Sequence, residues 1–182
     1  MTAFIAIIVL LVLEIIACTI AVVAMALFLY GAFTTRVPFV PMPRYVVDAL
    51  VREAPLHSGD TLYDLGSGDG RVVFSMAAAY KNARAVGIEK APLPYFISRV
   101  RSWILKLPNA EIRRENFINT SLTKATHVFT YLFPEIMREL LPKFERELSP
   151  GTRVISCDFP LEGREPERTI IVKRYTLYVY AF

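Results

Sequence analysis

The stretch Tyr63-Asp64-Leu65-Gly66-Ser67-Gly68-Asp69-Gly70-Arg71-Val72 decides how this chain folds. It continues an apolar run that begins at Thr61, and a second apolar run of helical character follows it directly. This is the order of strand, glycine turn and helix in a nucleotide-binding βα unit. The alternate glycines Gly66, Gly68 and Gly70 permit positive φ angles and a close approach of the backbone to a ligand. We therefore predict a ligand at the N-terminus of this helix.

The spacing of the motif separates two kinds of ligand. A dinucleotide fingerprint places its third glycine three residues after the second and lays a pyrophosphate on the helix dipole. Here the pattern is G-x-G-x-G, and Asp64 lies two residues ahead of Gly66, where its charge would repel a pyrophosphate. An acidic group there suits a ligand with a cationic end. On the glycines alone, an NAD site and a structural turn remain alternatives.

A second acidic residue, Glu89, ends the next apolar strand, which we expect over residues 84–89. Its distance along the chain is about that at which an acidic side chain binds a ribose diol. Alone, it would more simply be a solvated strand-end carboxylate. Together with Asp64 and the glycine turn, it favours a ribose-binding site.

The N-terminal segment contributes strongly to the 54% hydrophobic fraction of the 182-residue chain. Between Ala3 and Phe33 the only formal charge is Glu14, and about 20 apolar residues cross a bilayer. A secretory signal is the alternative, but no basic residue precedes the apolar run, which continues past the cleavage-like Ala24-Met25-Ala26. We predict an uncleaved single-pass anchor over residues 1–35 and assign Glu14 no role.

Charge is placed unevenly around this anchor. Nothing basic precedes it, whereas Arg36, Arg44 and Arg52 follow it, so the positive-inside rule predicts a cytoplasmic C-terminal domain. All 21 basic residues lie after position 35, against 16 of the 17 acidic ones, which gives that domain a charge of +5. The excess suits contact with membrane lipid. It has neither the Lys/Arg runs nor the aromatic-interleaved basic motifs of nucleic-acid binding, so we expect no nucleic acid.

Cysteine and histidine indicate neither a disulfide framework nor a metal site. Cys18 lies in the anchor and Cys157 in a late strand-like run, so we expect two reduced thiols. His57 and His127 are isolated and lack metal-ligand spacing. We therefore expect no metal.

Two further parts follow the anchor. Residues 36–60 comprise a proline-rich segment over 37–43, whose prolines impose an extended path, and then a helix that Pro43 is suited to begin. In residues 61–182, strands alternate with helical runs, which predicts an α/β fold with a doubly wound parallel sheet. We expect strands over 84–89, 110–114, 126–132 and 152–158, helices over about 92–106 and 134–148 with a kink at Pro142, and two edge strands within 169–182.

The residues after each strand are the remaining site candidates, because ligands bind at the carboxyl ends of strands in open α/β sheets. The Asn116 amide is placed to hydrogen-bond an adenine edge, and Phe117 to cover its face. Tyr131 and Phe133 would face the reacting group. The alternatives are a turn asparagine and aromatic residues that belong to the core.

Several of these motifs together resemble the small membrane-anchored lysine methyltransferases. D-x-G-x-G-x-G over 64–70 resembles motif I of class I methyltransferases, which depend on S-adenosyl-L-methionine (SAM), and the proline-rich segment, Tyr131–Glu135 and Pro150–Pro160 resemble this narrower family. Its studied members act in mitochondria on the c-ring protein of ATP synthase and on the adenine nucleotide translocase. The likeness covers most of residues 37–182.

The resemblance implies a seven-stranded, mostly parallel sheet, SAM as the cofactor and a lid over residues 39–45. It implies a methyl transfer from a sulfonium to an in-line nucleophile, for which positioning supplies much of the barrier reduction. Tyr131 and Glu135 are then candidate catalytic residues that orient a neutral lysine. The cofactor-binding residues would be Asp64, Gly66, Ser67, Gly68, Asp69, Gly70, Glu89, Asn116, Phe117 and Tyr131.

Three departures from the family pattern bear on substrate and source. Met42 stands where a hydroxyl residue is often found, and Gly163-Arg164 stand where a tryptophan is expected. Both leave the substrate open. The N-terminus lacks an Arg-rich transit sequence, which favours a bacterial inner-membrane relative.

Three functions are consistent with the sequence. The first is a membrane-anchored protein-lysine methyltransferase with a membrane-protein substrate. The second is a methyltransferase of a membrane small molecule, such as a quinone or lipid. The third is a nucleotide-binding module without catalysis.

Overall fold

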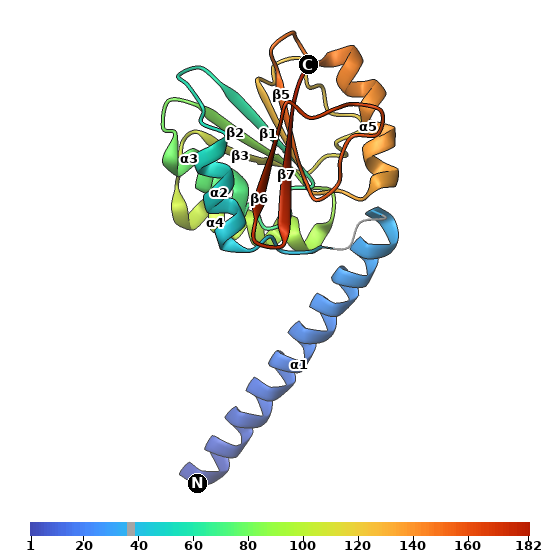
Figure 1. Cartoon of the computed structure of the whole chain (residues 1–182). Coiled ribbons are helices and arrows are strands. Elements are labelled where there is room, and N and C mark those ends of the chain that lie inside the picture. Colours follow the sequence, from blue (N-terminus) through green and yellow to red (C-terminus); the bar gives the residue numbers. More distant parts are fainter. Residues whose placement is uncertain (36–38) are drawn as a thin grey trace.

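The glycine-turn stretch lies at the centre of a seven-stranded sheet (Figure 1). A computed structural model describes residues 1–35 and 39–182, without the side chains of residues 3 and 31–35. The strands are β1 (Thr61–Leu65), β2 (Arg84–Ile88), β3 (Ala110–Arg113), β4 (His127–Thr130), β5 (Arg153–Cys157), β6 (Arg168–Val172) and β7 (Tyr175–Ala181). The helices are α1 (Thr2–Thr35), α2 (Arg44–Glu53), α3 (Arg71–Ala79), α4 (Pro92–Leu105) and α5 (Pro134–Glu147).

The strand order is β3-β2-β1-β4-β5-β7-β6, with β1 to β5 paired in parallel and β7 antiparallel to both β5 and β6. This confirms the predicted doubly wound α/β class and the mostly parallel seven-stranded sheet. The chain reverses its direction of winding between β1 and β4, and such a switch point opens a crevice at the strand ends. Leu65 pairs with Ile88 of β2 and Thr130 of β4, so these three strands end at one level.

Two apolar cores cover the faces of the sheet. Successive residues of a strand point to opposite faces, so Leu62 joins one core and Tyr63 the other. The first core is closed by α2 and α3, and the second by α5. Each fully buried large apolar side chain contributes about 1.5–3 kcal/mol relative to exposure. The packing fixes β1, and with it the glycine turn, from both sides.

The structure differs from the expected elements mainly at their ends. The expected strand over 126–132 stops at Thr130, which leaves Tyr131 and Leu132 in the loop before α5. Helix α5 is assigned as one α-helix from Pro134 through Pro142 to Glu147. In the proline-rich segment, residues 37 and 38 lie outside the described residues.

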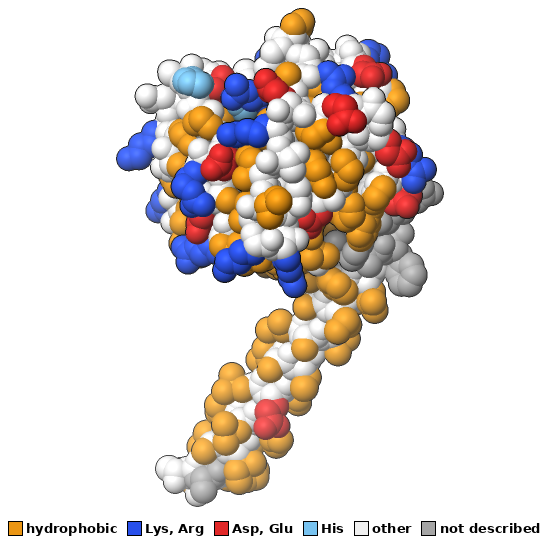
Figure 2. All heavy atoms as spheres, viewed as in Figure 1, with side chains coloured by type: hydrophobic (Ala, Val, Ile, Leu, Met, Phe, Trp, Pro, Cys, Tyr) orange, Lys and Arg blue, Asp and Glu red, His pale blue; other side chains and the backbone are white. Residues whose placement is uncertain are grey.

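Helix α1 projects away from the domain (Figure 1). Its stretch Phe4–Tyr30, 27 residues, is long and apolar enough to cross a membrane, and none of it is buried against the domain. Figure 2 shows its surface as almost entirely hydrophobic. A single helix of this kind near an N-terminus has the composition of either a membrane span or a signal sequence.

The buried Tyr180 hydroxyl provides a test of the second core. It accepts a hydrogen bond from the Leu161 backbone N–H at 2.9 Å, and both residues are buried. Tyr180→Phe leaves that N–H without its acceptor, so we expect the free energy of unfolding to fall by about 1–3 kcal/mol. Chemical denaturation of the detergent-purified protein measures this loss. Tyr178→Phe, at a partly exposed neighbour, is the control, and an equal loss in both variants would contradict the assignment.

Candidate active site

The glycine turn has the backbone geometry that its sequence predicts. Gly66, Gly68 and Gly70 have φ angles of 78°, 56° and 77°. A Cβ on Gly68 would lie 2.6 Å from the Phe39 ring, and one on Gly70 would lie 2.5 Å from the Phe74 ring. Only glycine therefore fits these two positions without displacing an aromatic side chain.

A cleft lies at the carboxyl ends of β1, β2 and β4, where the switch point predicts one. It brings together every predicted cofactor-binding residue except Gly70, which instead precedes the first turn of α3. The residues that reach it are Asp64, Gly66, Ser67, Gly68, Asp69, Glu89, Asn116, Phe117 and Tyr131.

Glu89 ties the tip of β2 to the glycine turn. One carboxylate oxygen accepts a hydrogen bond from Gly68 N–H at 2.8 Å, and the other accepts one from Ala91 N–H at 2.6 Å. Burial raises the pKa of Glu89 and outweighs these backbone hydrogen bonds, which lower it. A carboxylate has about four acceptor sites, so Glu89 retains capacity to accept from a ribose diol.

Asp64 is the most strained charge in the cleft. Burial, followed by the nearby charges of Glu89 and Asp69, raises the pKa of Asp64 well above its usual value. Within residues 39–182, no hydrogen-bond donor reaches its carboxylate. A cationic ligand group would relieve both the desolvation and the repulsion.

Asp69 takes a different role from the one expected. Its carboxylate contacts Arg71 at 2.6 Å and Arg101 at 2.9 Å. Burial raises the pKa of Asp69, but the hydrogen bonds from Arg71 and the charges of both arginines outweigh burial and lower it. Arg71 also donates to the Met42 carbonyl oxygen at 2.5 Å. The Asp69 side chain therefore fastens the segment before α2 to the turn, and a direct contact with cofactor stays a prediction.

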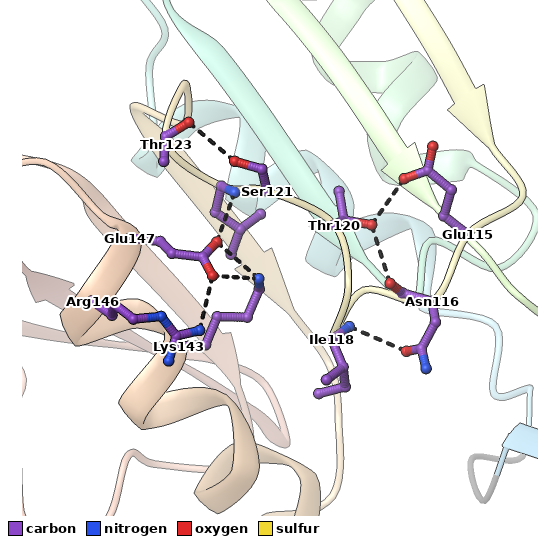
Figure 3. Close-up of polar contacts among 10 residues, drawn as sticks. Glu115, Asn116, Ile118, Thr120, Ser121, Thr123, Lys143, Arg146 and Glu147 are labelled. Atoms are coloured by element: carbon purple, nitrogen blue, oxygen red, sulfur yellow. Dashed lines mark hydrogen bonds and ion pairs between the residues drawn. The ribbon is translucent and has the colours of Figure 1, made fainter.

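Asn116 lies in a turn that is fixed at two points (Figure 3). Its Oδ1 accepts a hydrogen bond from Ile118 N–H at 3.1 Å, and its backbone oxygen accepts one from the Thr120 hydroxyl. Farther along the loop, Glu147 of α5 accepts from Leu122 N–H at 3.0 Å. The turn and the site interpretations of Asn116 are thus compatible, because its amide NH₂ is not used in these bonds.

Aromatic rings form one wall of the cleft. Tyr131 stacks on Phe159 with ring centroids 6.1 Å apart, and Phe133 meets Phe159 edge-on at 5.7 Å. Burial first, and then the charge of Asp158, raises the pKa of Tyr131 to about 12. Tyr131 therefore keeps its phenolic proton at neutral pH and cannot act there as a phenolate base.

The structure does not bring Glu135 to the cleft. Its side chain is 73% exposed in the first turn of α5 and lies 3.9 Å from Arg138. Proximity in sequence to Tyr131 is a poor guide here, because the direction in which the first helical turn presents its residues depends on how α5 packs.

Several residues of the cleft were not predicted as site residues. Phe159 follows β5, so the strand-end rule that selected Tyr131 would also have found it. Lys90 and Ala91 directly follow Glu89 and were open to the same argument. The segment over 39–42 lines the cleft, in agreement with the expected lid position. The others missed are Arg71, Val72, Pro94, Phe129 and Leu132.

The donor set of the cleft fits SAM. The buried Ser67 hydroxyl has no hydrogen-bond partner among the described residues, and Asp64 lacks a counter-charge there. Acceptors and acidic groups beside a glycine cradle match a cofactor with an ammonium group, a ribose and a sulfonium. In the described part of the chain, no cluster of three or more His, Cys, Asp or Glu side chains is arranged to hold a metal.

Asp64→Asn tests this electrostatic interpretation. The variant keeps the shape but removes the charge, so SAM affinity should fall about 10- to 100-fold, the range for a hydrogen bond to a charged group. Because its pKa is higher in the folded than in the unfolded chain, ionised Asp64 destabilises the fold above the folded-state pKa, and this penalty vanishes below the unfolded-state pKa. The ligand-free variant should therefore melt higher than the wild type at neutral pH, with the difference shrinking as the pH falls.

Calorimetry with SAM and thermal melting across pH measure these two effects. Asp48→Asn, which alters an exposed carboxylate of α2, is the matched control and should change neither. An Asp64→Asn protein that binds SAM as tightly as the wild type would refute the assignment of Asp64.

Comparisons with known proteins agree with this geometry. A family model described as "ANTKMT methyltransferase domain" matches residues 64–168, more than half of the chain. A protein-lysine N-methyltransferase of Saccharolobus islandicus (strain REY15A) is 33% identical over 159 residues, which cover 82% of this chain and 96% of that protein. The Mus musculus lysine N-methyltransferase of the ATP synthase c-ring protein is 35% identical and matches 72% of this chain. The match spans 53%, about half, of the mouse protein.

Solved structures show the same fold. A crystal structure described as an RNA methyltransferase from Salinibacter ruber, in complex with S-adenosyl-L-homocysteine, is 36% identical with a TM-score of 0.74 and covers 78% of this chain and 93% of that one. A precorrin-6y C5,15-methyltransferase from Geobacter metallireducens, at 15% identity and a TM-score of 0.64, shares the fold over 78% of this chain and 89% of its own. With a glycine cradle and an acidic cleft in the same place on the sheet, the chain belongs to the ANTKMT methyltransferase family and is a SAM-dependent class I methyltransferase.

Proposed function

We propose that this protein methylates a lysine side chain of a membrane or membrane-associated protein. One observation carries the proposal: the segment that follows the apolar helix α1 lines the cofactor cleft itself, at Phe39 to Met42. An acceptor held in or near a membrane would therefore meet the cleft close to the anchor. Support comes from relatives named as lysine N-methyltransferases of the ATP synthase c-ring protein and of adenine nucleotide translocase.

Each part of the cleft has a role in holding the cofactor. When bound, SAM supplies a methyl group on a sulfonium that a nucleophile can displace. Asp64 would face its cationic amino-acid end, Glu89 would accept from the ribose diol, and the glycine turn would leave room for its backbone contacts. The amide of Asn116 would donate to the adenine edge, beside the ring of Phe117.

The aromatic wall suits a lysine acceptor. A lysine must lose its proton before it can act as a nucleophile, and its usual pKa is about 10.4. An apolar wall formed by Tyr131, Phe133 and Phe159 disfavours the charged ammonium, because desolvation lowers the pKa of an amine. Tyr131 keeps its own proton, so it orients the amine and excludes water without acting as a base.

The anchor assignment belongs to the same proposal. Phe4–Tyr30 would span the bilayer, and the basic residues that follow it would hold the domain on the cytoplasmic side. A bacterial inner membrane remains a prediction from the N-terminal sequence. Lipid contact is likewise proposed from charge and from the exposed apolar helix.

Labelling of membranes tests the acceptor. Membranes from a strain that lacks the protein are incubated with the purified full-length enzyme and radiolabelled SAM, then separated into protein, organic-extractable and RNA fractions. We expect label in protein, and mass spectrometry should locate it on lysine. Asp64→Asn is the matched loss-of-binding control. Label found only in the organic extract would establish a lipid or quinone acceptor, and label only in RNA would establish a nucleic-acid acceptor; either result overturns the lysine assignment.

Tyr131 variants test the wall. Tyr131→Phe keeps the ring, so its pH profile of methylation near neutral pH should match that of the wild type, with the rate rising as the acceptor loses its proton. Tyr131→Ala opens the wall to water and should lower kcat/KM by about tenfold or more, which corresponds to about 1.4 kcal/mol. Steady-state assays across pH measure both. A profile that flattens in Tyr131→Phe would show that the phenol does titrate in the reaction.

A further inference from the structure

Helix α4 presents large apolar side chains to solvent. Phe96, Trp103 and Ile104 are 63%, 75% and 63% exposed. Spacings of seven and eight residues from Phe96 place Trp103 and Ile104 on the same face of a helix, whereas Ser98 is buried on the inner side. This pattern is the reverse of the usual one for a surface helix, in which the apolar stripe faces the core. It therefore calls for a partner.

The charge around this apolar face has one sign. Between Pro92 and Lys106 the sequence contains three basic residues, Arg99, Arg101 and Lys106, and no acidic one. Arg101 is paired with Asp69, while Arg99 and Lys106 lie on the exposed side of α4. An apolar face with basic residues beside it is the composition of helices that lie in the interface of an anionic membrane.

The position of α4 points to the same partner. Helices α1 and α4 contact each other, and α4 lies along the edge of the domain from which α1 departs (Figure 1). Figure 2 shows Lys and Arg side chains along that edge. Whatever surface α1 enters, α4 is therefore the element of the domain that meets it.

We infer that α4 docks on the surface of the membrane that α1 spans, with Phe96, Trp103 and Ile104 in the interfacial layer. Arg99 and Lys106 extend toward anionic headgroups, since long basic side chains can place their charge in the headgroup region while their stems stay apolar. Tryptophan is enriched at this depth because its ring is amphipathic. The inference rests on the proposed membrane anchor and goes beyond it by naming the second contact.

Docking of α4 also sets the orientation of the cleft. Ala91 and Pro94, at the start of α4, line the cofactor cleft. A membrane-bound α4 would therefore hold the cleft at a fixed height and angle above the lipid. A domain attached through α1 alone would be free to rotate away from it.

Trp103 makes the contact directly measurable, because it is the only tryptophan in the chain. Full-length protein is reconstituted into vesicles of phosphatidylcholine with anionic phosphatidylglycerol, with and without lipids brominated on the acyl chains. We expect Trp103 emission at shorter wavelength than in water, quenching by the brominated lipid and protection from acrylamide. Vesicles without anionic lipid should weaken all three effects.

Two sets of variants make the test specific. Trp103→Phe combined with Glu145→Trp moves the reporter to an exposed residue near the end of α5, on the other core, where bromine should not quench it. Arg99→Glu with Lys106→Glu should abolish the dependence on anionic lipid. Lys124→Glu, in the exposed loop before β4, is the charge-matched control and should leave that dependence unchanged.

Flotation of the same vesicles separates the docking from the anchor. Protein that floats while Trp103 behaves as in water overturns the docking and leaves the anchor standing. Protein that does not float overturns both. Trp103 that is shielded from acrylamide but not quenched by bromine is covered by protein, either a second copy or a substrate, and this also overturns lipid docking. Lysine methylation is scored separately by the labelling assay.

Discussion

The carboxylate of Glu89 is the contact on which the site depends. By accepting from Gly68 and Ala91, it fastens the glycine turn and the start of α4 to the tip of β2. Its burial makes the arrangement costly, because an ionised carboxylate loses water there. The two backbone donors offset part of that cost. One side chain thus fixes the cofactor cradle and the helix that carries the exposed apolar face.

The cleft is arranged for its ligand at the expense of the empty fold. Asp64, Asp69 and Glu89 place three acidic groups near one another, and only Asp69 has arginine partners among the described residues. The repulsion that raises the pKa of Asp64 is the same force that a cationic cofactor would relieve. Binding energy and native-state strain are therefore two aspects of one charge pattern, as is common where function opposes stability.

Much of the fold and the cradle could be predicted from sequence because both follow from local rules. Alternating strands and helices specify the sheet, and strand ends specify where Asp64 and Glu89 meet. The failures depend on distant contacts. Asp69 pairs with Arg101, which is 32 residues away in sequence, and no spacing rule indicates that pairing. Glu135 lies away from the cleft because the rotation of α5 is decided by its core packing.

The short connection between Thr35, where α1 ends, and Phe39, which lines the cleft, has a consequence for selectivity. The three intervening residues can span no more than a few steps of about 3.5 Å each. An anchored enzyme of this build would act as a depth gauge, accepting amines that rise to one narrow level above the lipid and passing over those held higher or deeper. Effective concentration, set by such a tether, would then choose the acceptor more than its surrounding amino-acid sequence does.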